Sequence, residues 1–121
     1  MTIETRKPFG PKAGIFSSTG AMSESGSFLN SSLILEDVST PDSVTVHVTQ
    51  RFEGALGTFT LRAAISQTAS GHPRVLSDHG SWVVIGGTES YETLRGRGRV
   101  TGTADDALDL IRRTYSGRVS R

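Results

Sequence analysis

Three polar side chains on two strand-like segments are the first candidates for chemistry: His47, Glu53 and Arg62. Residues 44–53 alternate with period two, so their valines share one face, and His47 and Glu53 share the other. Arg62 lies on the polar face of the next alternating segment, 58–67. Facing a lumen, these groups could orient a water molecule or polarise a ligand carbonyl. Facing solvent, they form ordinary cross-strand pairs, and the apolar phase is the more natural core lining.

Metal and nucleophile chemistry have little support in the sequence. His72 and His79 flank Asp78, but they lie in a Pro-containing loop without an HxH or HExxH pattern. There is no cysteine, which excludes disulfides, thiolate catalysis and sulfur-ligated zinc. Neither a GxSxG nucleophile elbow nor a GxxxxGK[ST] phosphate loop is present. We therefore expect no metal site.

A basic stripe follows at Arg95, Arg97 and Arg99, with glycine at the two positions between them. On one strand these arginines share a face, which would suit phosphates or an acidic partner. The alternative is an exposed face neutralised by the aspartates of residues 105–109, and the formal net charge of +1 favours it. Because glycine leaves the other face of this strand without side chains, we expect a bulky group from another part of the chain to lie against it.

The elements that would position these residues are short strands. Blocks of Thr, Val, Ile and Phe are separated by Gly, which is typical of an antiparallel β-protein with many turns. Glycines at both ends of residues 54–57 predict a hairpin, and Pro41–Asp42 predicts a turn. Residues 104–113 fit either a short helix or a loop and strand. Seven or eight strands of this kind avoid exposed edges by closing, so we predict an all-β fold, a small eight-stranded antiparallel β-barrel with at most one short helix.

Length and charge limit the organisation and the partners. The chain of 121 residues suits one domain, which we place at 13–121, after a flexible arm at 1–12 that contains two prolines. A net charge near zero argues against nucleic acid and anionic membranes as partners. No apolar run approaches the roughly 20 residues of a membrane span, and the first residues lack the apolar run of a signal peptide. We expect a cytoplasmic protein.

A resemblance is carried by residues 82–98, WVVIGGTESYETLRGRG. They resemble the strand, turn and strand of the allene oxide cyclase and dirigent barrels, where an apolar strand runs into Gly-Gly-Thr-Gly, an aromatic residue follows, and Gly starts the next strand. Two positions depart from the pattern, since Glu89 replaces the third Gly and Leu94 replaces the Ala usual in dirigents. The hairpin at 51–59 is similar to that of a bacterial family of uncharacterised small barrels of the same fold. The matching motif residues are Gly86, Gly87, Thr88, Tyr91 and Gly96.

The motif itself is mainly structural. A Gly pair followed by Thr can form a turn with positive φ. Tyr91 could then fold back over the space left by Gly96 and Gly98. The resemblance covers about residues 44–102 and bears on fold more than on activity.

The resemblance implies a cofactor-free cyclase or isomerase that confines a lipophilic small molecule in the barrel lumen, a mechanism that depends on shape. It also implies a homo-oligomer, a dimer or trimer. The alternative is a non-catalytic ligand-binding or structural interaction barrel, because side chains can fill an eight-stranded barrel completely. The expected ligand-lining residues are Phe59, Leu61, Trp82, Val84 and Tyr91, with His47, Glu53 and Arg62 as polar candidates.

Overall fold

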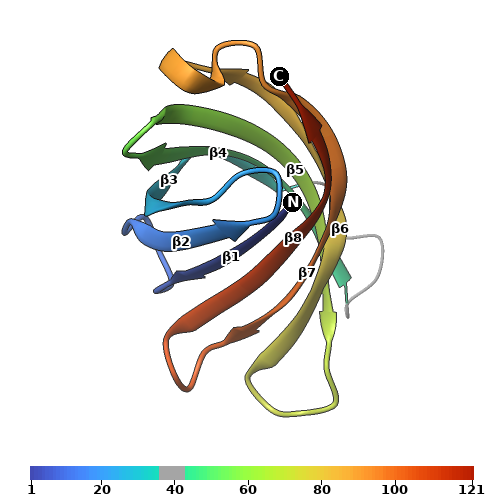
Figure 1. Ribbon diagram of the computed structural model, residues 1–121. Helices are drawn as coiled ribbons and strands as arrows, with labels where there is room; N and C mark the ends of the chain where they lie inside the picture. The colour runs from blue at the N-terminus through green and yellow to red at the C-terminus, as the bar shows by residue number, and fades with distance from the viewer. Residues whose placement is uncertain (36–42) are drawn as a thin grey trace.

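The computed structural model describes residues 1–35 and 43–121, and it shows a closed antiparallel barrel (Figure 1). Each strand pairs with its neighbours in the chain, and β1 pairs with β8 to close the sheet. The helical element of the described residues is one 3₁₀ turn, η1 (Glu89–Tyr91). The predicted eight-stranded barrel is confirmed, whereas the turn predicted at Pro41–Asp42 lies outside the described residues. The strands are β1 Thr2–Lys7, β2 Gly14–Thr19, β3 Glu24–Leu35, β4 Ser43–Gly54, β5 Gly57–Ala69, β6 Val75–Gly87, β7 Arg95–Asp105 and β8 Leu110–Ser120.

The alternation of β4 and β5 sets which side chains enter the lumen. Val46, Val48 and Phe52 are buried, and Gln50 is the polar member of the same phase. The two strands are joined by the predicted hairpin, in which Gly54 pairs with Gly57. Polar residues between these positions therefore face outward.

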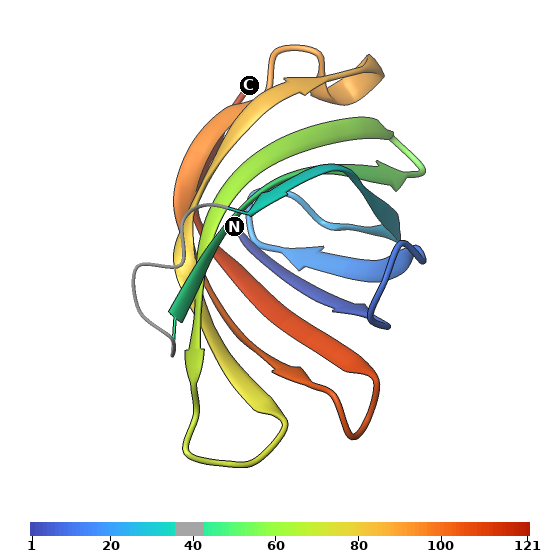
Figure 2. The same cartoon turned by 180° about the vertical axis from the view of Figure 1, so that it is seen from behind.

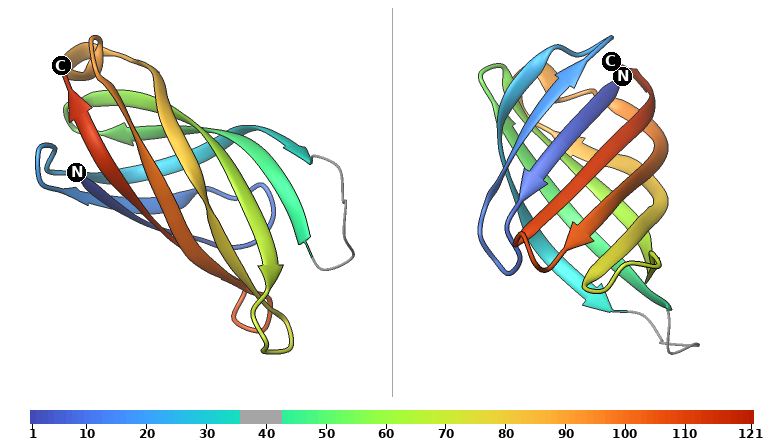
Figure 3. Two further views of the ribbon diagram at one scale, coloured as in Figure 1. Left: turned by 90° about the vertical axis from the view of Figure 1, so that its right-hand side faces the viewer. Right: turned by 90° about the horizontal axis from the view of Figure 1, so that it is seen from below.

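The predicted flexible arm is wrong for residues 2–7, because this segment is the strand that closes the barrel. β1 pairs with β2 on one side and with β8 on the other. Ile3, Thr5 and Lys7 are buried in strict alternation, a pattern hidden in the sequence because only one of the three is apolar. The Met1 amino group also donates to the Gly117 carbonyl at 2.9 Å, which ties the start of the chain to β8, beside which β1 runs in the right-hand view of Figure 3.

Residues 104–113 adopt the loop-and-strand alternative instead of a helix. β7 runs to Asp105, and β8 begins at Leu110 after a tight turn. The Leu108 amide donates to Asp105 Oδ1 at 3.2 Å, and Asp109 takes a positive φ of 50°. Aspartates whose spacing is typical of a helix N-terminus therefore form and cap a hairpin turn in this chain.

Four lumen-facing glycines let the long wall β5–β8 bend sharply (Figure 2). They are Gly80, Gly98, Gly102 and Gly117, and a Cβ at any of them would overlap a carbonyl oxygen of the adjacent strand. Gly98 and Gly117 are direct partners, and the Trp82 indole lies against Gly117 and donates to the Arg99 carbonyl at 3.0 Å. The nearest groups beside the alternating glycines are therefore backbone and side-chain atoms of β8, and the indole of Trp82 lies against Gly117, the partner of Gly98.

The Gly-Gly-Thr motif ties the β6–β7 connection to β5. The Thr88 hydroxyl accepts from the Thr58 amide at 3.1 Å, and the Thr88 amide donates to the Thr58 carbonyl at 2.9 Å. A Cβ at Gly87 would overlap the Tyr91 carbonyl oxygen, so this glycine serves a close approach. Positive φ falls not on the Gly pair but on Glu89, at 54°, where the resembling families have glycine.

The Glu24 carboxylate holds Tyr91 and the β4–β5 turn together. It accepts from the Tyr91 hydroxyl at 2.8 Å and from the Leu56 and Ala55 amides at 3.0 and 3.1 Å. Burial alone would raise the pKa of Glu24, but these hydrogen bonds and one from Ser25 hold it below the ordinary value. Burial and the bond to Glu24 raise the pKa of Tyr91 to about 12, so Tyr91 keeps its proton.

We predict that Gly98→Ala destabilises the barrel by about 1–3 kcal/mol, because the added methyl group overlaps backbone that cannot retreat. Gly86→Ala is the matched control, since nothing lies within 4 Å of a Cβ there and its φ is ordinary. The control should change the free energy of unfolding by less than about 1 kcal/mol, toward higher stability. Urea titration followed by circular dichroism measures both; equal effects would contradict the steric explanation.

We also predict that Glu89→Gly raises stability by up to about 1 kcal/mol, because glycine adopts positive φ without strain. Ser90→Gly is the control, because Ser90 is exposed and lies outside the positive-φ residues. It should lower stability by roughly 0.5–1 kcal/mol through the greater freedom of the unfolded chain. A lower melting temperature for Glu89→Gly would show that the Glu89 side chain has a stabilising role of its own.

Candidate functional site

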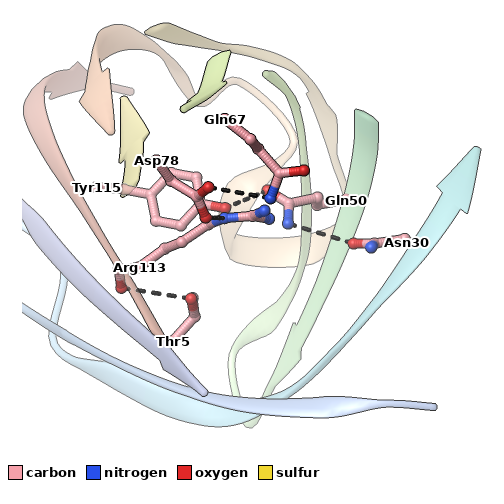
Figure 4. A network of polar contacts seen from close by, with 7 residues as sticks. All are labelled: Thr5, Asn30, Gln50, Gln67, Asp78, Arg113 and Tyr115. Atoms are coloured by element: carbon pink, nitrogen blue, oxygen red, sulfur yellow. Dashed lines mark hydrogen bonds and ion pairs between the residues drawn. The ribbon is translucent and has the colours of Figure 1, made fainter. Parts of the chain in front are cut away.

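A buried ion pair spans β7 on the lumenal side of the wall, near the end where β6 and β8 begin (Figure 4). Arg113 Nε donates to Asp78 Oδ2 at 3.0 Å, and Gln67 Nε2 donates to Asp78 Oδ1 at 3.0 Å. The Asp78 side chain is 0% exposed and the Arg113 side chain 8%. We call these residues, with Gln50, Tyr115, Asn30, Lys7 and Thr5, the polar layer.

Glycine at position 102 makes this ion pair possible. Asp78 on β6 is paired with Gly102 on β7, and Gly102 is paired with Arg113 on β8. The three positions form one row, and the middle one has no side chain. Arg113 therefore reaches across β7 to Asp78, and a Cβ at Gly102 would lie within 2.8 Å of Arg113 Cγ.

A second set of hydrogen bonds continues the polar layer toward β3. The Tyr115 hydroxyl donates to Gln50 Oε1 at 2.7 Å, and Gln50 Nε2 donates to Asn30 Oδ1 at 3.2 Å. Burial raises the pKa of Tyr115, and the nearby charge of Arg113 opposes that rise. Tyr115 therefore remains a neutral donor at ordinary pH.

Lys7 adds a second buried cation beside Arg113. Its Nζ donates to the Pro8 and Gly10 carbonyls at 2.7 and 2.8 Å, and its side chain is buried. Burial lowers the pKa of Lys7, the charge of Arg113 lowers it further, and Asp109 opposes the shift. With Lys7 and Arg113 against Asp78, the described polar layer carries an excess of positive charge.

Three connections are tied together at this end of the barrel. The Phe9 amide donates to Asp109 Oδ1 at 3.0 Å, which joins the β1–β2 and β7–β8 connections. Arg74 pairs with Asp106 at 2.9 Å, which joins the β5–β6 and β7–β8 connections. The polar layer thus lies beneath loops held in fixed positions relative to one another.

Stacked aromatic rings fill the opposite part of the lumen. Phe52 stacks on Phe59 and Phe28 with ring centroids 4.9 and 5.2 Å apart, and Phe16 packs edge-on against Phe52 at 5.1 Å. Tyr115 contacts Phe52 at 6.3 Å and so joins this aromatic cluster to the polar layer. One part of the interior is therefore a packed aromatic core, and the other part carries polar groups.

The predicted ligand-lining residues all lie on the inward phase. Phe59, Leu61, Trp82 and Tyr91 are buried, and Val84 is partly buried against them. Phe59 and Tyr91 pack with centroids 5.3 Å apart within the aromatic cluster. A ligand contacting these residues requires the rings to separate, so their role in binding stays a prediction.

The three polar candidates face away from the lumen, as the alternation favoured. His47 and Arg62 line a groove on the outer wall, whereas Glu53 lies apart and pairs with the exposed Arg51 at 3.5 Å. The structure therefore does not bring His47, Glu53 and Arg62 together in one lumenal site.

The basic stripe also lies on the outer wall, at exposed positions of β7. Its expected neutralisation by residues 105–109 is wrong, because these aspartates lie at the far hairpin turn. Asp106 pairs there with Arg74, and Asp109 accepts from Phe9. The stripe therefore keeps its positive charge toward solvent.

Sequence reasoning missed most of the polar layer. Lys7 falls in the predicted arm, and Arg113 falls in the predicted helical pattern. Gln50 was visible as the one polar residue in an apolar phase. Every second residue of a strand faces the same side, so Asp78 faces inward with Trp82, and Arg113 faces inward with Tyr115. This alternation was the one signal in the sequence that could have identified both residues as buried.

Chemically, the polar layer can hold and polarise an oxygen atom. Arg113 donates one N–H to Asp78 and has five in all, so it keeps donor capacity for a carboxylate or carbonyl oxygen. The Lys7 ammonium group on the adjacent strand donates two of its three N–H groups to carbonyls and keeps one, whereas the single hydroxyl hydrogen of Tyr115 is already donated to Gln50. Fixed donors in a water-poor space stabilise developing negative charge effectively.

We predict that Arg113→Met destabilises the protein by about 3–5 kcal/mol, because it leaves the Asp78 carboxylate buried and unpaired. Asp78→Asn in the same chain removes that charge and keeps an oxygen acceptor for Gln67. The double variant should therefore recover most of the lost stability. Thermal unfolding of the single and double variants measures this coupling; if the double variant is no more stable than Arg113→Met, the buried charge is not the cause.

Some kinds of site are absent from the described part of the chain. Residues 1–35 and 43–121 hold no group of three or more His, Asp or Glu side chains that could ligate a metal ion. No helix among them is long and apolar enough to cross a membrane. Comparisons of the chain with known protein families, with curated proteins and with solved structures found no match.

Proposed function

We propose that this barrel binds a small lipophilic molecule with an acidic or carbonyl head group in its lumen. The head group would meet Arg113 and Lys7 in the polar layer, and the apolar body would lie along aliphatic inward residues such as Ile65 and Val46. The observation that carries the proposal is the buried Asp78–Arg113 pair with a second buried cation beside it.

Stability is a weak reason for that arrangement. Buried ion pairs are often no more stabilising than apolar residues of similar volume, because desolvation offsets the attraction. Here the buried Lys7 ammonium group adds a further desolvation penalty, reflected in its lowered pKa, and the charge of Asp109 offsets that penalty only in part. An anionic ligand would balance the charge, which gives the arrangement a purpose in binding.

As an enzyme, the barrel would act as a cofactor-free cyclase or isomerase. Arg113 would polarise an oxygen of the ligand, and the lumen wall would restrict the ligand to reactive conformations. Because the pKa of Tyr115 is raised, its hydroxyl stays protonated in this scheme and holds Gln50 in place, and it does not act as a base. The alternative is a non-catalytic ligand carrier, which needs the same charge excess but no turnover. Assembly into a homo-oligomer stays a prediction.

Binding is tested with two probes of equal chain length, dodecanoate and dodecanol. We expect dodecanoate to bind at least about tenfold more tightly, because only the carboxylate meets the two cations. The Asp78→Asn/Arg113→Met variant should lose that preference while remaining folded. Isothermal titration calorimetry measures both probes.

The matched control is Arg6→Met, which removes one arginine from the exposed outer face of β1. It should bind dodecanoate as the unchanged protein does. Failure of both probes to bind, or equal affinity for acid and alcohol, would contradict the proposal. Native mass spectrometry of the purified protein identifies the ligand that it carries. If incubation with the protein converts that ligand into another isomer, the barrel is a cyclase or isomerase. If the ligand stays unchanged, the barrel is a carrier.

A further inference from the structure

A second feature lies on the opposite side of the wall, in a groove that crosses the outer faces of β4–β8. Its volume is about 1010 Å³. Because strands lie about 4.8 Å apart, a groove across five strands is about 19 Å long. We call it the basic groove, and the side chains that characterise it are Arg62, His79, Val83, Arg97, Arg99 and Arg118.

The charge of the basic groove is not balanced within the described residues. Its described lining includes four arginines and no carboxylate. The ion pairs of the described residues involve other arginines, namely Arg51, Arg74 and Arg113. The exposed aspartates of the β7–β8 turn are held at the far end of that hairpin by Arg74 and Phe9.

The arginines are also placed against one another. Arg97 and Arg118 are direct cross-strand partners, and Val83 separates Arg97 from Arg62 in the same row. Like charges opposite each other destabilise a sheet by a few tenths of a kcal/mol. An exposed face gains no stability from this arrangement, which is the arrangement expected of a surface that binds an anion.

The floor of the groove indicates which kind of anion fits. Val83 is 42% exposed between arginines, and Ala64 adds a second small apolar side chain. Trp82 is only 2% exposed because its indole packs inward, so the described lining offers no Phe, Tyr or Trp ring on which nucleic-acid bases could stack. A second copy of the chain meeting this face symmetrically would set arginines against arginines.

We propose that the basic groove binds an extended segment of a partner protein in which acidic residues occupy every second position. Arg97 and Arg99 lie two residues apart on one strand face, about 6.6 Å, which equals the repeat of alternate side chains in an extended peptide. Carboxylates at every second position would pair with the arginines, and the side chains between them would point away from the groove. Arginine suits this role because its guanidinium pairs bidentately with carboxylates.

The test is fluorescence anisotropy with a labelled peptide of alternating Glu and Leu. We expect the unchanged protein to bind it, and Arg97→Gln/Arg99→Gln to weaken binding by at least about tenfold. The matched control is Arg6→Gln/Arg112→Gln, which removes the same charge from exposed positions of β1 and β8 beside Glu4. The control should bind within about twofold of the unchanged protein. Circular dichroism verifies that both variants fold.

Two further measurements make the outcome specific. A peptide of the same composition with its glutamates in adjacent pairs should bind more weakly than the alternating Glu–Leu peptide, because only alternate residues share one face of an extended chain. A single-stranded oligonucleotide of equal charge should bind more weakly than the Glu–Leu peptide. Absence of peptide binding, equal loss in the groove and control variants, or tighter binding of the oligonucleotide would each overturn the proposal.

Discussion

The close approach of backbones along β6, β7 and β8 is the constraint on which the rest of the structure depends. At Gly80, Gly98, Gly102 and Gly117 the neighbouring strand occupies the space that a side chain would need. Only glycine therefore allows the wall to bend at these positions. On the inside, the missing side chain at Gly102 lets Arg113 reach Asp78. On the outside, the same bend lies under the basic groove, whose lining includes Gly80, Gly98 and Gly117. One property of the backbone therefore shapes both faces of the wall.

The interior combines two solutions to filling a small barrel. Toward η1, Phe52, Phe59 and Tyr91 pack closely, and Tyr91 is fixed by its hydrogen bond to Glu24. Toward the β7–β8 turn, charged and amide groups replace rings. Because aromatic packing would serve stability at both ends, the polar end is the part of the core that folding does not explain.

Much of the fold could be predicted from residue patterns, and the reason is local. Alternation in β4 and β5 identified the inward phase, and paired glycines identified their hairpin, because both signals depend only on near neighbours in sequence. The polar layer depends on cross-strand register, which joins Lys7, Asp78 and Arg113 from three distant segments. Lys7 and Arg113 were missed because a buried charge looks like a surface residue until its partner is known. The resemblance likewise anticipated the barrel, but it could not show that a residue in the position of its third glycine, Glu89, would carry the positive φ.

The two proposed sites share strands but use opposite phases of them. On β8, Arg113 and Tyr115 face the lumen while Arg112 and Arg118 face outward. On β7, Val100 and Gly102 face inward while Arg97 and Arg99 face outward. A side chain can therefore change on one face without entering the other, because successive Cβ atoms point to opposite sides of a sheet. The glycines are the exception, since a change in the bend they permit would move Arg113 inside and the arginine row outside together. The two proposed binding functions are thus separable at the side chains and coupled only through the backbone.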